Sequence, residues 1–263
     1  MTHVIADSAT MLHRNLIHMI RYPGLTLFLV AAPVVFLLLF VFVFGGTLGA
    51  GLPGVSGGTA TDYLNYLVPG LLLLTVGGGV AGTAAISVAM DMTEGIVARF
   101  RTMAISRTAV LTGHVLGTVV QGLLAVALLV GVALLLGFRP TAGPLGWIGA
   151  IAILVVVSLA VAQLAVAMGI ASRTVETASN LPMLILLLPM LGSGFVPTGS
   201  MPAWLQGFAQ YQPFTPFIET VRGLLFGTDL GIYPWLTLGW AVAIGAGGYL
   251  WARMLYERRS VIR

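Results

Sequence analysis

The sequence predicts an all-α integral membrane protein. Of its 263 residues, 58% are hydrophobic and only 8% are charged, whereas about a quarter of the residues in an ordinary soluble domain are charged. Its longest apolar runs reach about 20 residues, which is enough for a helix to cross the roughly 30 Å hydrocarbon core of a bilayer. We therefore expect six transmembrane helices, at about 25–44, 64–89, 109–137, 147–171, 181–196 and 235–255.

The segment before the first span, residues 1–24, is predicted to be an amphipathic helix. Its apolar and its basic side chains fall on opposite helical faces, with Leu12, Leu16, Met19 and Ile20 against Arg14, His18 and Arg21. Such a helix should lie flat on the inner leaflet. The remainder, residues 25–263, is expected to form one transmembrane domain.

The first two spans differ in how regular they are. The first is an unbroken apolar run, and the Gly-rich stretch Gly45–Thr61 after it is expected to be a flexible connection. The second contains Pro69 and the run Gly77–Gly79. Membrane helices tolerate Pro and Gly because neighbouring helices can satisfy the freed backbone groups, so we expect this span to stay helical with a kink near Pro69.

The later spans are separated by turn residues and short polar links. A Pro/Gly turn at 138–146 joins the third and fourth spans, and a polar link at 172–179 precedes the fifth, which Pro182 and Pro189 should interrupt. Between the fifth and sixth spans, two apolar segments are each too short to cross a bilayer. We expect a re-entrant or interfacial helical hairpin there, hinged at Pro213 and Pro216.

The arginines predict how the chain is oriented. Six spans place both termini on one side, and ten of the twelve arginines fall on that side, against only Arg139 and Arg222 on the other. By the positive-inside rule that side is the cytoplasm. We expect a multi-pass protein of a bacterial plasma membrane with both termini cytoplasmic.

Several kinds of chemistry are excluded by what the sequence lacks. It has no cysteine and no lysine, so it has no thiolate metal site and no standard Walker A loop, whose lysine must reach the phosphates. The spacing of its histidines matches no zinc motif, and no catalytic constellation is visible. The isolated arginines do not suggest nucleic acid. We expect no cofactor in this chain, and any ATP and Mg must be bound by another subunit.

A charged stretch, Asp91–Arg107, separates the second and third spans and holds five of the twenty charged residues. Apolar side chains recur along it at helical spacing. It is expected to be a cytoplasmic helix that couples to a soluble partner, although an amphipathic connector resting on anionic lipid has the same pattern. The candidate coupling residues are Asp91, Glu94, Ile96, Arg99, Phe100, Arg101 and Met103.

Other polar residues lie within or between the apolar segments. Glu219 and Arg222 are neighbours on a helix, and a compensating pair is expected where an isolated charge would cost about 3 kcal/mol. With Pro213 and Pro216 they form a candidate extracellular gate, or they simply hold the hairpin together. A possible translocation path comprises His114, Gln121, Gln163 and Asn180; interhelical hydrogen bonding is the more common role of such residues.

These features together resemble the membrane subunit of type-2 ABC exporters, in the daunorubicin-resistance-type permease group. The resemblance covers nearly the whole chain. It rests on the order and spacing of the predicted N-terminal helix, Tyr63–Leu72, Asp91–Arg107 with Ala109–Gly117, Gly194–Pro197, Met201–Leu205 and Gln212–Thr215 with Arg222–Leu225.

The resemblance implies specific roles for two segments. In that family the loop between the second and third spans is the coupling helix, which seats in a cleft of the ATPase, and short extracellular helices precede the last span. The family commonly has proline where this chain has Ala104. The helix is therefore expected to run a turn further here, which changes the expected seating of Arg107.

The function implied is that of a permease subunit in an ATP-driven exporter of amphipathic or hydrophobic compounds, such as a drug, lipid or glycolipid. Two ATPase subunits and a second permease subunit, identical or homologous, would complete it. An ion-coupled carrier is an alternative, but the spans hold almost no carboxylates and no convincing repeat. A non-transporting membrane anchor for a soluble enzyme is another.

Overall fold

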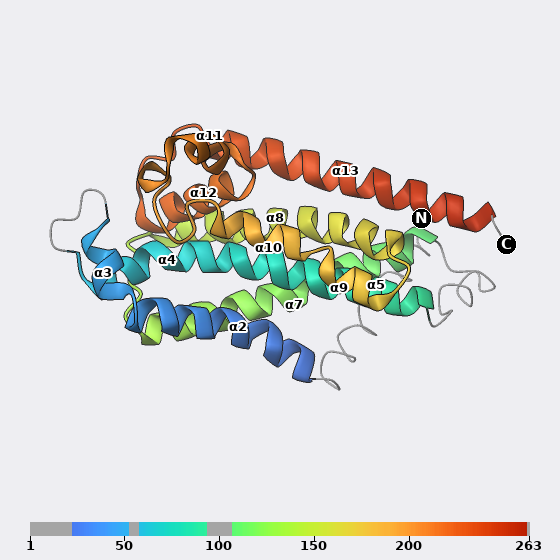
Figure 1. The fold of residues 1–263 in the computed structure, drawn as a ribbon, viewed down its shortest axis with the longest axis horizontal. Coiled ribbons are helices and arrows are strands. Elements are labelled where there is room, and N and C mark those ends of the chain that lie inside the picture. Colours follow the sequence, from blue (N-terminus) through green and yellow to red (C-terminus); the bar gives the residue numbers. More distant parts are fainter. Residues whose placement is uncertain (1–22, 53–57, 94–106, 262–263) are drawn as a thin grey trace.

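A computed structural model of the chain describes residues 23–52, 58–93 and 107–261, and its regular structure is entirely helical over these residues. The long helices run side by side along an elongated bundle (Figure 1). In chain order the helices are α2 (Pro23–Phe42), α3 (Gly45–Ala50), α4 (Ala60–Leu74), the π-helix η1 (Thr75–Val80), α5 (Ala81–Thr93), α7 (Arg107–Leu135), α8 (Pro144–Ala171), α9 (Val175–Asn180), α10 (Met183–Met190), the 3₁₀-helix η2 (Thr198–Ser200), α11 (Ala203–Tyr211), α12 (Phe214–Phe226) and α13 (Tyr233–Val261).

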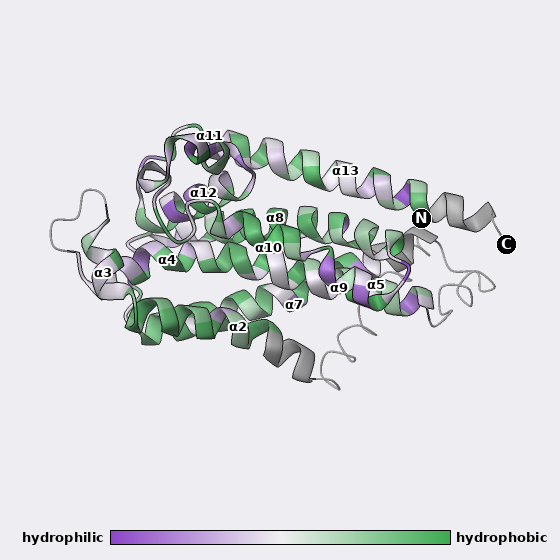
Figure 2. Cartoon of the chain, in the orientation of Figure 1, coloured by the Kyte–Doolittle hydropathy of each residue, from purple (hydrophilic) through white to green (hydrophobic). Residues whose placement is uncertain are grey.

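The described residues include three helical stretches that are long and apolar enough to cross a membrane. They are Ala60–Thr93, Thr112–Leu135 and Pro144–Ala171, and shorter apolar helices occupy Leu29–Phe42 and Val175–Met190. Hydrophobic residues dominate along these helices (Figure 2). The all-helical membrane fold is thus confirmed, whereas the count of six spans stays a prediction. The predicted N-terminal helix lies outside the described residues.

The prediction of a flexible connection at Gly45–Thr61, after the first span, is wrong in part, because this stretch contains the helix α3. A Cβ atom on Gly49 would lie 2.4 Å from the carbonyl oxygen of Thr59, so glycine lets α3 pack directly against the start of α4. Thr59 then begins α4 with a capping box, in which its hydroxyl accepts from the Asp62 amide and the Asp62 carboxylate accepts from the Thr59 amide. In this stretch, glycine therefore permits close packing between helices as well as backbone flexibility.

The second span is one helical stretch whose irregularity lies beyond Pro69. Pro69 remains inside α4, and the hydrogen-bonding pattern changes at η1, where Gly77–Gly79 stand. Neighbouring side chains crowd these glycines: a Cβ atom on Gly78 would lie 2.2 Å from Leu186, and one on Gly79 would lie 2.2 Å from Leu29. The absence of side chains lets the first and fifth apolar segments approach the same turn.

The predicted fifth span, 181–196, is interrupted at its prolines, as the sequence predicts. The polar link before it contains α9, and α10 ends at Met190, directly after Pro189. Proline lacks the amide hydrogen that a helix interior needs, so Pro182 separates α9 from α10 and the chain turns after α10. Within 181–196 the helix is α10 alone, which is too short to cross a bilayer by itself.

The predicted hairpin before the last long helix has the two short helices expected of it, α11 and α12. The turn between them is at Gln212 and Pro213, where Pro213 precedes the first residue of α12. Pro216 is not a hinge, because it lies buried in the first turn of α12. Proline is tolerated there because first-turn amides have no partner within the helix.

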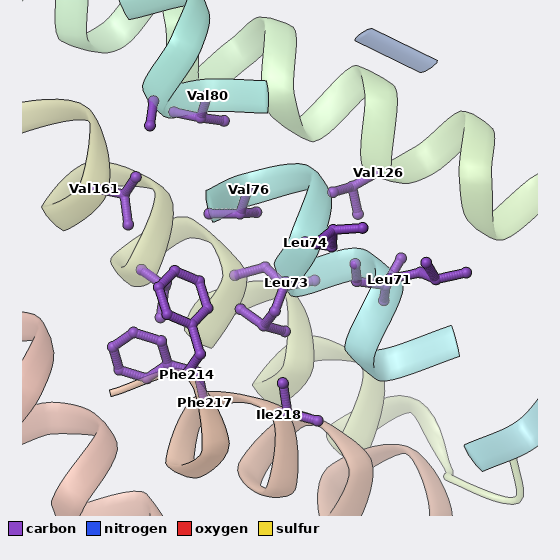
Figure 3. Close-up of a cluster of buried hydrophobic side chains, with 14 of the residues drawn as sticks. Leu71, Leu73, Leu74, Val76, Val80, Val126, Val161, Phe214, Phe217 and Ile218 are labelled. Atoms are coloured by element: carbon purple, nitrogen blue, oxygen red, sulfur yellow. The ribbon is translucent and has the colours of Figure 1, made fainter. Parts of the chain in front are cut away.

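The core gathers where α12 inserts into the bundle (Figure 3). Phe214 and Phe217 of α12 are fully buried, and their rings pack edge to face with centroids 5.6 Å apart. Around them lie apolar side chains from α4, η1, α7 and α8, among them Leu73, Val76, Val126 and Val161. This packing anchors α12 in the bundle, so groups on α12 are held rigidly against α4.

Candidate coupling and gating sites

The predicted coupling stretch is bracketed by the end of α5 and the start of α7. Asp91, in the last turn of α5, is the one candidate coupling residue that the structure describes. The other candidates lie outside the described residues: Glu94, Ile96, Arg99, Phe100, Arg101 and Met103, as does Ala104. What the structure shows is therefore how the two flanking helices are joined.

A buried polar triplet joins α5 to α7 beside that stretch. The Nε2 atom of His114, in α7, lies 3.0 Å from Asp91 Oδ2, and its Nδ1 atom lies 3.2 Å from Ser87 Oγ. Asp91 and His114 are 7% and 5% exposed. An ionised Asp91 accepts from Nε2–H, which leaves Nδ1 to accept from the Ser87 hydroxyl in the neutral ring. Both ring nitrogens are thus used, and the ring orientation is fixed.

This triplet regroups residues that the sequence had assigned to different sites. Asp91 was a candidate coupling residue and His114 a candidate path residue, but they form one contact. Ser87 was missed, although it stands one helical turn before Asp91 and so shares its face. A polar contact buried between two helix ends can hold them in one register.

A second polar cluster centres on Arg222 of α12. Its guanidinium pairs with Glu219 one turn earlier and donates to the carbonyl oxygens of Tyr66 (3.1 Å) and Ser193 (2.8 Å). It also lies over the Tyr66 ring, with 3.9 Å from Cζ to the centroid. The Tyr66 hydroxyl donates to the same Ser193 carbonyl, at 3.0 Å. One arginine therefore ties α12 to α4 and to the turn after α10.

The surroundings of the Arg222 cluster keep its backbone segments close. A Cβ atom on Gly70 would lie 2.2 Å from the carbonyl oxygen of Gly194, so the turn after α10 rests directly on α4. Burial raises the pKa of Tyr233, at the start of α13, and the negative charge of Glu219 raises it further. Tyr233 thus stays neutral and adds no second negative charge beside Glu219.

The turn of the hairpin between α11 and α12 is held by a network of hydrogen bonds around Gln212 and Thr215, which are 4% and 1% exposed. Gln212 donates to the Leu188 carbonyl at 3.1 Å and accepts from the Phe214 amide at 3.0 Å. The Thr215 hydroxyl accepts from the Ser193 amide at 3.2 Å. The bond from the Phe214 amide satisfies a donor that the start of α12 would otherwise leave unpaired, and the other two tie this turn to α10 and to the turn after it. Of the candidate gate residues, Glu219 and Arg222 meet, whereas Pro213 and Pro216 only shape the start of α12.

The remaining candidate path residues are distributed over separate elements. Gln121 lies partly buried on α7, Gln163 lies partly buried on α8 and lines a groove, and Asn180 is exposed at the end of α9. His114 is beside Asp91, so the four candidate path residues do not come together within the part of the chain that the structure describes.

The two polar clusters lie near opposite ends of the continuous helix formed by α4, η1 and α5 (Figure 1). Tyr66 and Asp91 are roughly 37 Å apart along it at about 1.5 Å per residue, which exceeds the hydrocarbon thickness of a bilayer. The fold is therefore that of a multi-helix membrane protein with structured polar contacts at both ends of its bundle.

Comparison with known proteins identifies the family. Residues 8–226 match the model of the ABC-2 type transporter family, so the chain belongs to that family. It is 31% identical over 234 residues to the daunorubicin resistance ABC transporter permease protein DrrB1 of Streptomyces coeruleorubidus, covering 86% of this chain and 80% of that protein. It is 23% identical over 171 residues to the probable doxorubicin resistance ABC transporter permease protein DrrC of two Mycobacterium tuberculosis strains, covering 64% of this chain and 61% of those proteins.

These matches confirm the resemblance predicted from the sequence. The chain is a membrane permease subunit of the ABC exporter type, from a family of permease subunits that lack the ATPase. The family assignment also decides against an ion-coupled carrier and against a non-transporting anchor.

Proposed function

We propose that two such permease subunits, identical or homologous, form a pathway that two separate ABC ATPase subunits open and close. The chain has no lysine and so no standard Walker A loop; ATP and Mg would be bound by the ATPases. The proposed cargo is an amphipathic or hydrophobic compound that enters from the membrane. Two observations support this choice: the relatives are named for daunorubicin and doxorubicin resistance, and apolar side chains dominate the bundle.

The observation that carries the proposed mechanism is the Asp91–His114 contact. Residues 94–106 connect α5 to α7, and the contact lies just inside both helix ends. Removing one partner of a buried hydrogen bond typically costs about 1–3 kcal/mol, and more where a charged group is left behind. A force applied to the connecting segment by an ATPase would therefore move α5 and α7 together instead of bending the joint between them. Rigid-body motion of this kind is one known way in which a conformational change passes from one part of a protein to another.

The Arg222 cluster is the proposed gate at the other end. Hydrogen bonds to a charged group contribute about 1.5–3 kcal/mol each, and Arg222 makes several at once. Moving α12 away from α4 would break them together, so this end should open only when the bundle itself moves. We further propose that both termini are cytoplasmic, in a bacterial plasma membrane. In Figure 1, α2 begins and α13 ends at the same end of the bundle as α5 and α9, which fits this orientation.

The coupling role can be tested with Phe100→Asp, which places a charge on the predicted apolar edge of the coupling helix. We expect the variant to insert normally but to lose stimulation of the co-purified ATPase. Thr174→Asp is the matched control, since it adds the same charge at an exposed N-cap, where aspartate caps as well as threonine. Unchanged ATPase stimulation in Phe100→Asp would sink the assignment of this segment.

A further inference from the structure

An apolar groove runs along the contact between α8 and α13. Two adjoining cavities of about 190 and 400 Å³ share Leu159, Gln163 and Tyr249, and the first also reaches α7. Their lining extends along α13 from Leu238 to Ala252, roughly 21 Å at 1.5 Å per residue. The groove is therefore elongated, and it covers more than half the thickness of the hydrocarbon core.

The groove follows from how closely α8 and α13 cross. A Cβ atom on Gly248 would lie 2.5 Å from the backbone nitrogen of Leu164, and one on Gly245 would lie 3.5 Å from Ala160. Small residues let two membrane helices approach backbone to backbone. Gly245 and Ala160 also line the larger cavity, so the groove lies directly beside this close contact.

Gln163 gives the groove its polar feature. It stands in α8 roughly 12 Å from the helix end at Ala171, within the predicted fourth span. No hydrogen bond joins its amide to any other part of the chain that the structure describes, and it borders both cavities. An amide that faces hydrocarbon without a partner costs several kcal/mol. The side chain therefore favours an occupant that can donate or accept a hydrogen bond at this depth.

We infer that the α8–α13 groove binds an uncharged, lipid-like amphiphile, with its chain along the groove and its ester or hydroxyl group on Gln163. An elongated apolar groove fits a hydrocarbon chain. Among the residues that the structure describes, its lining contains no charged side chain, and the polar members are Gln163, Tyr249 and Thr112, which match a neutral group. This site lies away from the Asp91 and Arg222 clusters and does not depend on ATPase coupling.

The test uses the permease in nanodiscs with two photoactivatable probes, a diazirine-bearing monoacylglycerol and a diazirine-bearing alkane of equal chain length. We expect the monoacylglycerol to label peptides that contain Leu159 or Tyr249. Gln163→Leu keeps the volume but removes the amide, and it should reduce this labelling about three- to tenfold, as expected for the loss of one hydrogen bond. Leu159→Trp fills the groove and should reduce labelling by both probes. Gln121→Leu, the same change on α7, is the matched control and should have no effect.

Three results would overturn the inference: equal labelling of Gln163→Leu and the unaltered protein, equal labelling of these peptides by the alkane and the monoacylglycerol, or labelling confined to other helices. The lack of native cysteine allows a separate check of the rival occupant, a second copy of the chain. Val242→Cys, in the lining of the groove, should not form a disulfide-linked dimer on oxidation. An efficient dimer through this position would show that a subunit, not an amphiphile, covers the groove.

Discussion

The Asp91–His114 contact gives the sharpest test of coupling, because its structural and mechanical roles can be separated. Asp91 and His114 are each less than 10% exposed, and Asp91 Oδ2 lies 3.0 Å from His114 Nε2. Asp91→Leu leaves the neutral His114 buried without this partner, which should lower the free energy of unfolding by about 1–3 kcal/mol, and His114→Leu leaves a carboxylate there, which should cost more. Denaturation by SDS, followed by circular dichroism, measures this loss.

The double variant Asp91→Leu/His114→Leu should behave differently. Replacing both members of a buried pair by apolar residues is often neutral or stabilising, so most of the lost stability should return. The register imposed by the hydrogen bond would still be missing, since leucine contacts are not directional. We expect ATPase stimulation by substrate to stay low in the reconstituted complex, although the ATPase remains bound.

The exchanged variant Asp91→His/His114→Asp completes the experiment, since it restores a carboxylate and an imidazole to the same helix contact. It should recover both stability and a substantial part of the ATPase stimulation. If the double leucine variant is stable and couples fully, the contact serves packing alone, and the reasoning that a fixed register transmits movement is refuted.

Two further predictions concern the opposite end of the bundle. Arg222→Met should lower the free energy of unfolding by about 1.5–3 kcal/mol because it leaves the partly buried Glu219 without its cation, and adding Glu219→Gln should recover part of this stability in the same SDS assay. Gly70→Ala should also lower the free energy of unfolding. The new Cβ atom would lie 2.2 Å from the Gly194 carbonyl oxygen, so the backbone would have to shift. Gly82→Ala, with nothing within 4 Å, should instead stabilise its helix by about 1 kcal/mol; equal effects of the two changes would contradict this account.

The sequence predicted a helix well where the residues of that segment alone determine its first and last residues. The third and fourth spans were placed within three residues of α7 and α8 in the structure, because uninterrupted apolar length alone defines such helices. In the fifth the helix is shorter than the predicted bounds, because Pro182 and Pro189 limit it more than apolar content extends it. Helix α3 was missed because its stability depends on packing against Thr59, a contact that no local pattern records.

The candidate sites also divide into contacts that local spacing predicts and contacts that depend on how the helices pack. The pairing of Glu219 with Arg222 follows from helical spacing and was predicted. The larger part of the Arg222 cluster was not, since its other partners are backbone carbonyl oxygens of Tyr66 and Ser193, and every residue has a carbonyl. Asp91 and His114 were both selected as polar residues near apolar spans, but their contact depends on how α5 and α7 pack, which lies beyond local sequence.

The helix formed by α4, η1 and α5 is the element that both polar clusters share, since Tyr66 lies near one end and Asp91 near the other. Its π-helical middle is where side chains of three other elements converge on glycine: Leu29 of α2, Leu186 of α10 and Phe214 of α12. π-helical turns within α-helices often occur at functional sites. Under the proposed mechanism, a displacement at Asp91 would have to pass this point to reach Arg222. Because α2, α10 and α12 pack directly against it, they would move with the helix, and the gate would respond to the bundle as a whole rather than to α12 alone.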